Sequence, residues 1–345
     1  MSENSIKYSF KNDYSELAHP KVLQALSAIG TVQFEGYGLD NYSYEAAQLV
    51  KGKISDPSVD VHFISGGTHA NLVVISSMLR PYEAVIAVES GHIFGHEAGA
   101  IEATGHRICT VKGNDGKLSA DDVKKVVAAH EDEHMVKPRM VYISQASETG
   151  TIYTKDELST ISKYCRKNRL LLFLDGARLG TAVNSHMSDL TYAEISSLVD
   201  VFYIGGTKNG ALFGEAIVIR NEELKADFRF HLKQKGALLA KGAAIGIQFD
   251  ALLRDGLYDE LALSADTMAL ELAKGIEKLG YELVYPAQTN MIIPLFPNEV
   301  TKKLHEMYSF HLWETFDEMT SVRLVTSWAT PKSAVDEFLS DLAAI

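Results

Sequence analysis

Cysteine is scarce in this sequence, and long apolar runs are absent from it. The two cysteines, Cys109 and Cys165, are too few for a disulfide framework and lack the spacing of a metal site. No apolar run approaches the roughly 18–20 residues that a membrane helix needs. The polar start, Met1–Phe10, has no apolar core of the kind found in signal peptides. The sequence therefore predicts a cytoplasmic protein without membrane contacts.

A basic patch is also missing. The 345 residues include 33 Lys and Arg against 45 Asp and Glu, which gives a net charge of −12, and both signs are scattered along the chain. Nucleic acid is therefore not an expected partner. Neither a Gly-x-Gly-x-x-Gly fingerprint nor a P-loop occurs. With 46% hydrophobic and 23% charged residues, the composition is that of an ordinary globular enzyme.

Short runs rich in branched apolar residues alternate with helical stretches over most of the chain. Runs of this length and composition are typical of strands that are buried on both faces. The expected strands are Ala84–Val88, Met140–Ser144, Leu170–Leu174 and Val199–Ile204. The expected helices are His69–Leu79, Ala120–His130, Lys155–Lys167, with Asp156 as its cap, and Tyr192–Leu198. This alternation predicts an α/β layer with a mainly parallel central sheet.

The pattern changes after about residue 245. Apolar residues recur every three or four positions from Leu261 to Leu279, which predicts a helix that Gly280 ends. Expected strands and a last helix follow at Tyr281–Tyr285, Asn290–Phe296, Val322–Ser327 and Pro331–Ala344. Because the chain exceeds the usual size of a single core, we predict a large domain over residues 1–245 and a small C-terminal α+β domain over residues 246–345.

Asp175 directly follows the apolar run Leu170–Leu174, at the expected carboxyl end of a strand, where open α/β sheets bind ligands. A carboxylate beside a buried strand needs a compensating positive group. A protonated pyridine nitrogen would supply one, and the acid would keep that nitrogen protonated, which makes a pyridine cofactor a better electron sink. The alternative is an aspartate that caps a helix beginning at Gly176–Arg178, and the residue alone does not decide between the two.

Lys208 lies in the turn Gly205–Gly210, which follows the apolar strand Val201–Ile204 and precedes a second apolar segment, Ala216–Ile219. Glycines on both sides let the backbone turn tightly, so the lysine can project into a crevice at the sheet edge. A lysine that forms an imine needs such a place, where desolvation or cationic neighbours lower its pKa. A solvent-facing turn lysine is the alternative, and the flanking apolar runs argue against it.

Two further segments are suited to bind anions. Ser65–Thr68 leads into a predicted helix, so that its glycines permit close approach of a phosphate and the helix N-terminus supplies free N–H donors. Arg323 lies inside an apolar strand and needs an anionic partner there. That partner is either a substrate carboxylate or a buried acid of the protein.

The segment Gly91–Glu97 contains two histidines, His92 and His96, four residues apart. The imidazole of His92 could stack on a cofactor ring and transfer protons. A metal site is the alternative, but the order His-Glu-x-x-His of zinc proteases is absent. We therefore predict no metal, and a structural role for His96.

Seven segments of the chain together resemble the threonine aldolases, which belong to the β-eliminating lyases and to the fold-type I pyridoxal-phosphate enzymes, and in particular their low-specificity L-threonine aldolase branch. The likeness covers nearly the whole chain and lies in Gly67–Leu72, His92–Gly99, Ser144–Gly150, Leu174–Arg178, Gly206–Gly210, Glu215–Val218 and Arg323–Ser327. The chain differs from some aldolases in having Glu148 where they have histidine, and from typical relatives in its more apolar segment Leu238–Ala244.

The resemblance implies a role for each matching residue. Lys208 would form the imine with pyridoxal 5'-phosphate, and Asp175 would bind the pyridine nitrogen. Gly67, Thr68 and Thr207 would lie around the phosphate, and His92 would stack on the ring. Arg178 and Arg323 would bind the substrate carboxylate, with Asn12 from the N-terminal segment 1–30 nearby. Lys241 and Tyr37 would reach the site of a neighbouring subunit in a tetramer built from dimers.

The resemblance also implies a fold-type I architecture, with helices on both faces of the central sheet, and cleavage of β-hydroxy-α-amino acids such as L-threonine or L-allo-threonine to glycine and an aldehyde. His92 is then the first candidate for the general base and Glu148 the second. The alternatives are a β-eliminating lyase or transaminase that acts on another amino acid, a metal-dependent hydrolase or aldolase, and a binding protein without activity.

Overall fold

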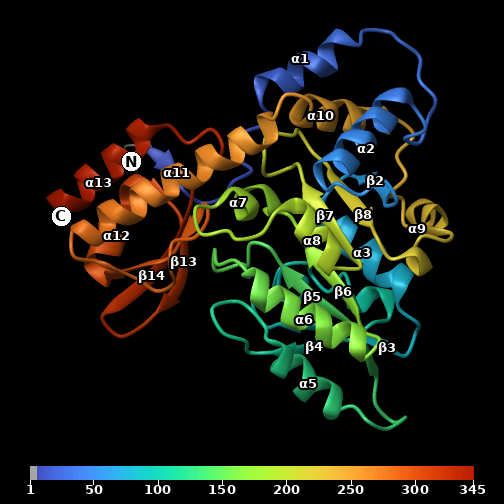
Figure 1. Cartoon of the computed structure of the whole chain (residues 1–345). Helices are drawn as coiled ribbons and strands as arrows, with labels where there is room; N and C mark the ends of the chain where they lie inside the picture. The colour runs from blue at the N-terminus through green and yellow to red at the C-terminus, as the bar shows by residue number, and fades with distance from the viewer. Residues whose placement is uncertain (1–5) are drawn as a thin grey trace.

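A seven-stranded sheet forms the centre of the large part of the molecule (Figure 1). The structure is a computed structural model that describes residues 6–345. The strands follow the order β2-β8-β7-β6-β5-β3-β4, with bounds β2 Asp60–Ile64, β3 Glu83–Val88, β4 Ile108–Val111, β5 Lys137–Ser144, β6 Leu171–Asp175, β7 Val201–Gly205 and β8 Glu215–Ile219. Pairs among β3 to β7 are parallel, and β8 runs antiparallel to β2 and β7. The predicted mainly parallel sheet is confirmed.

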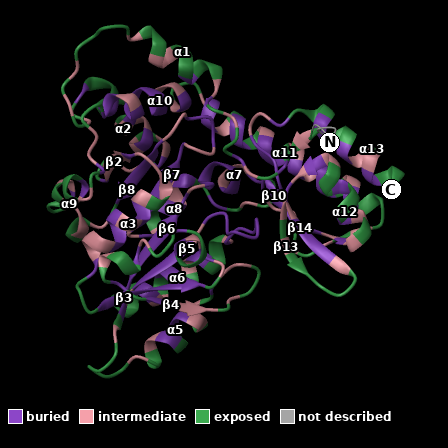
Figure 2. Cartoon of the chain, turned by 180° about the vertical axis from the view of Figure 1, so that it is seen from behind, coloured by how far each residue is buried: buried purple, intermediate pink, exposed green. Residues whose placement is uncertain are grey.

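Helices cover both faces of this sheet. Alternate residues of one strand, such as Ile86 and Val85 on β3, belong to two different core clusters. The first cluster joins the sheet to α1 (Pro20–Ala28), α2 (Asn41–Lys53), α5 (Ala120–Ala128), α6 (Lys155–Lys167), α8 (Tyr192–Leu198) and α10 (Ala243–Leu253). The second joins it to α3 (Gly67–Met78) and α9 (Phe228–Gln234). In Figure 2 the strands appear as a buried layer between these helices, so the α/β architecture that the sequence predicts is confirmed.

The elements predicted in this part agree with the structure to within a few residues, apart from one helix cap. Thr154, and not Asp156, caps α6, because the Thr154 hydroxyl accepts a hydrogen bond from the N–H of Glu157 and the Glu157 carboxylate accepts one from the N–H of Thr154. Asp156 lies within the first turn, where its charge is favourable at the positive end of the helix dipole. The prediction of Asp156 as the cap is wrong.

A smaller antiparallel sheet forms the C-terminal part. It contains β9 (Glu282–Leu283), β10 (Met291–Ile292), β11 (Pro294–Pro297), β13 (His311–Thr315) and β14 (Met319–Val325). Three helices pack with it around a core of their own: α11 (Leu257–Lys278), α12 (Asn298–Met307) and α13 (Lys332–Ala344). The run predicted as one strand, Asn290–Phe296, is two short strands, β10 and β11. Among the described residues, no helix combines the length and the apolar character that crossing a membrane requires.

The change from one core to the other occurs inside α11. Leu257 and Leu261, at its start, pack in the first cluster of the large sheet, whereas Ala269 and Leu272 pack in the core of the small sheet. The helix α10 also packs with the large sheet, against α1 and α2. The predicted domain boundary near residue 245 stays a prediction, and the change of core falls between Leu261 and Ala269.

The N-terminal segment runs from the small part to the large one. The strand β1 (Tyr8–Ser9) pairs in parallel with β12 (Tyr308–Ser309), and the next residue, Phe10, is fully buried in the core of the small sheet. Asp13 then bonds to Arg178 of the large part. Of the predicted active-site segment 1–30, residues 1–5 lie outside the described residues, and Tyr14 lines the cavities that are described below.

Candidate active site

Two adjoining cavities open at the carboxyl ends of β5, β6 and β7, where parallel sheets bind ligands. They measure about 340 and 680 Å³ and share five lining residues, Tyr14, His92, His96, Glu148 and Lys208. Asp175, Thr207 and Gly67–Thr68 line the smaller cavity only, and Arg178 and Arg323 line the larger one. The structure thus brings together nine of the residues to which the resemblance gives a role.

Asp175 ends β6, as the sequence predicts, and its buried carboxylate accepts four hydrogen bonds. Oδ2 accepts from the Tyr142 hydroxyl at 2.5 Å and the Asn71 amide at 3.2 Å, and Oδ1 accepts from the Tyr203 hydroxyl at 2.5 Å and the Ala177 N–H at 3.0 Å. Burial raises the pKa of Asp175, but the bonds from Tyr142 and Tyr203 outweigh it and hold that pKa below its usual value. Arg178, and not Asp175, is the N-cap residue of the next helix, α7 (Leu179–Asn184).

Lys208 lies in the glycine-rich turn between β7 and β8, and its side chain lines both cavities. Its ammonium group lies 5.9 Å from the centre of the Tyr14 ring. Burial, reinforced by the charge of Arg178, lowers the pKa of Lys208, although the carboxylates of Asp13 and Glu148 oppose that shift. The lysine therefore faces the cavities and is not a solvent-facing turn residue, and its lowered pKa is what a nucleophilic lysine requires.

Arg178 is held by Asp13, which the sequence reasoning missed. Its Nε and Nη2 donate to Oδ2 and Oδ1 of that carboxylate at 2.7 and 3.1 Å, a two-point contact that fixes the plane of the guanidinium group. Both residues are buried, and Asn290 donates a further hydrogen bond to Asp13 at 3.0 Å. Burial raises the pKa of Asp13, but Arg178, together with Lys208 and Asn290, lowers it below the usual value. The remaining nitrogen of Arg178, Nη1, stays available toward the cavity.

Glu148 lies between the two arginines of the larger cavity. Its Oε1 is 3.9 Å from Arg178 Nη1, and its Oε2 is 3.5 Å from Arg323 Nη1. Burial raises the pKa of Glu148, but the charge of Arg178, followed by that of Lys208, lowers it below the usual value. Because both separations exceed those of well-formed ionic hydrogen bonds, the N–H groups of the arginines are left for a second carboxylate.

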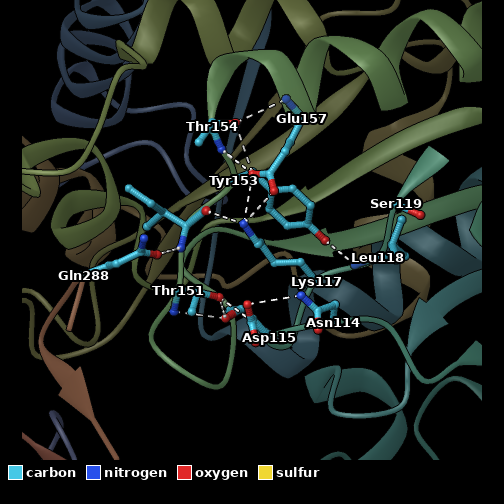
Figure 3. Close-up of polar contacts among 12 residues, drawn as sticks. Asn114, Asp115, Lys117, Leu118, Ser119, Thr151, Tyr153, Thr154, Glu157 and Gln288 are labelled. Carbon is cyan, nitrogen blue, oxygen red and sulfur yellow. Dashed lines mark hydrogen bonds and ion pairs between the residues drawn. The ribbon is translucent and has the colours of Figure 1, made fainter. Parts of the chain in front are cut away.

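The loop that carries Glu148 is fastened on two sides (Figure 3). The Thr151 hydroxyl donates to the backbone carbonyl of Asp115 at 2.6 Å, which ties the loop to a turn of the large part. The Ile152 N–H donates to the Gln288 side chain at 2.8 Å, which ties it to the segment before β10. The loop that follows Glu148 is therefore anchored both to the large part and to the segment before β10.

The first turn of α3 faces the smaller cavity at Gly67 and Thr68. No side chain caps this helix, so its first N–H groups are available to an anion. A Cβ added at Gly67 would lie 3.1 Å from the Tyr203 hydroxyl, which explains the glycine. Thr207 lines the same cavity, but its hydroxyl donates to Glu215 at 2.7 Å and accepts from the N–H of Gly214 at 3.0 Å.

Three predicted site residues lie away from both cavities. The Asn12 side chain accepts hydrogen bonds from the Tyr14 N–H and the Ser15 hydroxyl, so it stabilises a turn instead of lining the site. Tyr37 is exposed and lies 4.3 Å from the ammonium group of Lys233. Lys241 is exposed beside the groove between α1 and α10. Within one chain, Asn12, Tyr37 and Lys241 do not reach the site.

The residues that sequence reasoning missed differ in the signal they left. Tyr142 and Tyr203 are hydroxyl-bearing residues inside fully buried strands, where each hydroxyl needs a partner, and they could have been linked to Asp175. Asn71 is a polar residue among apolar neighbours on α3, which is a similar signal. Glu215 begins one of the seven matching segments, but no role was assigned to it. Asp13 left no signal, because only the folded chain brings it to Arg178.

The comparisons with known proteins agree with this geometry. A sequence profile described as β-eliminating lyase matches residues 22–297. The low specificity L-threonine aldolase of a Pseudomonas species is 31% identical to this chain, over 100% of the chain and 99% of the relative. A threonine aldolase structure from Leishmania major is 45% identical with a TM-score of 0.96, covering 98% of this chain and 99% of that one.

A more distant structure, the aspartate aminotransferase of Thermus thermophilus, is 14% identical with a TM-score of 0.74, and covers 98% of this chain and 91% of its own. At that identity the likeness concerns the fold alone, which is the fold-type I architecture expected from the sequence. The profile match and the full-length relatives together show the family. The chain belongs to the β-eliminating lyases and, among them, to the threonine aldolase family.

Proposed function

We propose that the protein is a pyridoxal 5'-phosphate-dependent aldolase that cleaves β-hydroxy-α-amino acids, such as L-threonine and L-allo-threonine, to glycine and an aldehyde. The observation that carries this proposal is the placement of Lys208 and Asp175 in one cavity that continues to the pair Arg178 and Arg323. The names of the relatives support the same reaction, since they are threonine aldolases.

The residues of the smaller cavity fit this cofactor. Asp175 is a buried carboxylate with a lowered pKa, as a partner for a protonated ring nitrogen must be. At another point of the same cavity the uncapped start of α3, at Gly67 and Thr68, offers N–H donors for a phosphate. Lys208 lines the same cavity with a lowered pKa. We propose that these residues hold the cofactor, with His92 against its ring.

The bound cofactor would supply the electron sink that bond cleavage beside an amino group requires. Arg178 and Arg323 would bind the substrate carboxylate and so orient the bond to be broken, and such positioning contributes several kcal/mol, roughly, to the lowering of a barrier. The contact with Asp13 keeps Arg178 in place before the substrate enters. Glu148 lies between the two arginines. When the substrate carboxylate binds, Glu148 would either move away from their N–H groups or share these groups with the substrate.

We propose His92 as the group that takes the proton from the β-hydroxyl, with Glu148 as the second candidate. Burial lowers the pKa of His92, but the hydrogen bond to Glu97 together with the charges of Glu148 and Asp175 raises it above the usual value. A histidine can accept a proton only in its neutral form. Because the pKa of His92 is raised, the loss of activity on acidification should begin at a higher pH than for a histidine with the usual pKa. Both side chains line the cavity that also contains Lys208.

The test of the proposed reaction is an assay of the purified protein with L-threonine and L-allo-threonine. We expect glycine and acetaldehyde in equal amounts, visible absorbance of bound cofactor, and complete loss of cleavage in Lys208→Ala. The same assay separates the alternatives, because a β-eliminating lyase would release a keto acid with ammonia and a transaminase would transfer the amino group. A wild-type protein that refuses pyridoxal 5'-phosphate would end the proposal.

We propose that the protein assembles as a tetramer of two dimers, with each site between two subunits. Lys208 is the only lysine or arginine among the described residues that line the smaller cavity, so a phosphate there lacks a second cation from its own chain. Exposed Lys241 and Tyr37 are available to a neighbouring subunit. The cytoplasmic location stays a prediction, which cell fractionation would test.

A further inference from the structure

We propose that Glu97 is a positioning residue that fixes the ring and the charge of His92 and, through Asn71, links it to Asp175. Glu97 follows the short helix α4 (His92–Gly95), and its side chain is fully buried. It lines neither cavity, so it does not touch the substrate. What His92 does in catalysis rests on the proposed function, whereas its contact with Glu97 does not.

The carboxylate of Glu97 has two partners on one oxygen. Oε1 accepts hydrogen bonds from His92 Nδ1 at 2.8 Å and from the Asn71 amide at 2.7 Å. Among the described residues, Oε2 has no hydrogen-bond partner although it is buried. A buried carboxylate is costly unless a positive group compensates it, and His92 is the ionisable group in contact. The arrangement therefore favours the protonated imidazole.

The bond to Glu97 also selects which ring nitrogen of His92 carries hydrogen. A carboxylate only accepts, so Nδ1 must be the donor. In the neutral ring Nε2 is then the nitrogen without hydrogen, and it is the one free to accept a proton. Glu97 thus determines both the orientation of the ring and the nitrogen that can act as a base.

Asn71 extends this contact to Asp175. It lies on α3 with no exposed surface, and its side-chain nitrogen donates to Glu97 Oε1 at 2.7 Å and to Asp175 Oδ2 at 3.2 Å. The two amide hydrogens suffice for one bond to each carboxylate. The amide therefore holds the two acids at a fixed separation, so that His92 and Asp175 are positioned by one connected group of side chains.

Several other charges act on His92. Glu148 and Asp175 raise its pKa from the cavity side and Lys208 lowers it, while the ring of His96 lies 5.6 Å away, centre to centre. Glu97 is the only one of these with a hydrogen bond to the ring. Its removal should therefore change both the pKa and the orientation of His92, while the other charges remain.

The test is the titration of His92, followed by NMR of 15N-labelled histidine side chains in the holoenzyme and in the protein without cofactor. The His92→Asn variant identifies the signal. In Glu97→Gln we expect the pKa of His92 to fall by about one unit, because an amide keeps the hydrogen bond but not the charge. The acidic limb of the pH–rate profile should shift by the same amount.

Glu102→Gln is the matched control, since Glu102 is exposed on the neighbouring 3₁₀ turn (Glu102–Thr104), and it should titrate like the wild type. If Glu97→Gln does not fold, the wild-type spectrum decides, because at a pH above the pKa of His92 the neutral ring must carry its hydrogen on Nδ1. An unchanged titration in Glu97→Gln, or hydrogen on Nε2 alone, overturns the inference. Failure of the proposed function would instead appear as absent aldol cleavage, and would leave this titration unaffected.

Discussion

Several charged side chains in and around the cavity have an oppositely charged partner. Asp13 holds Arg178, Glu148 lies between Arg178 and Arg323, and Glu97 binds His92. Asp175 differs from these three acids, since hydroxyl and amide donors stabilise it without a cation in contact. A carboxylate that is ionised yet unpaired is the one best able to bind an added cation.

Glu215 is a buried acid at the same site whose behaviour differs. It accepts hydrogen bonds from the Gly206 N–H and the Thr207 hydroxyl, both at 2.7 Å, yet burial raises its pKa to about 7. An acid with a raised pKa costs folding free energy once it ionises. The cost is absent below the usual pKa of 4.5, grows toward pH 7 and is complete above it.

We therefore expect Glu215→Gln to stabilise the protein at pH 8 relative to the wild type, by up to about 3 kcal/mol, and to change little at pH 4.5. Denaturant unfolding of the two proteins at both pH values measures this difference. Glu223→Gln is the control, because Glu223 is exposed on the following 3₁₀ turn. A stability difference that is the same at pH 4.5 and pH 8 would contradict the assignment.

At the scale of single elements, the start of α6 offers a comparison between two neighbouring residues. Thr154→Ala removes the cap and should cost about 1 kcal/mol of local stability, whereas Asp156→Ala should cost a few tenths, roughly, through the helix dipole. Hydrogen exchange of the first amides of α6 should accelerate about fivefold in the former and little in the latter. Equal acceleration in both variants would restore Asp156 as the cap.

Strands could be predicted from the sequence where they are buried on both faces. The strands β5, β6 and β7 are buried on both faces, so their apolar runs are continuous and easily recognised. The strand β2 was missed because it lies at the sheet edge and includes Asp60 and His62, only half buried. The helix cap was misassigned because Thr154 and Asp156 both have acceptor side chains, and only backbone geometry distinguishes them.

The juxtaposition of Asp175 and Lys208 was predictable for a topological reason. Each follows the carboxyl end of one of two neighbouring strands, β6 and β7, and such ends meet at one edge of a parallel sheet. Asp13 comes from a segment without pattern and reaches Arg178 and Asn290 only in the folded chain. Partners of this kind depend on tertiary packing, which local sequence does not encode.

At the scale of the assembly, the proposal that each active site lies between two subunits can be tested by mixing two inactive variants. We expect Lys241→Ala and Lys208→Ala to be inactive or strongly impaired alone, and to recover about a quarter of wild-type activity when co-expressed and randomly paired. Each mixed dimer then has one site with both lysines intact. If Lys241 serves its own chain, no such site forms, and co-expression would show only the sum of the separate activities.

The path of the N-terminal segment has a mechanical consequence. Phe10 is hydrogen-bonded to Ser309 and Val325 of the small part, and only two residues separate it from Asp13, whose carboxylate holds Arg178 of the large part. Two residues leave the backbone little length to extend between these contacts. Any hinge movement between the two parts must pull on that carboxylate, so opening of the molecule and release of the arginine become a single event.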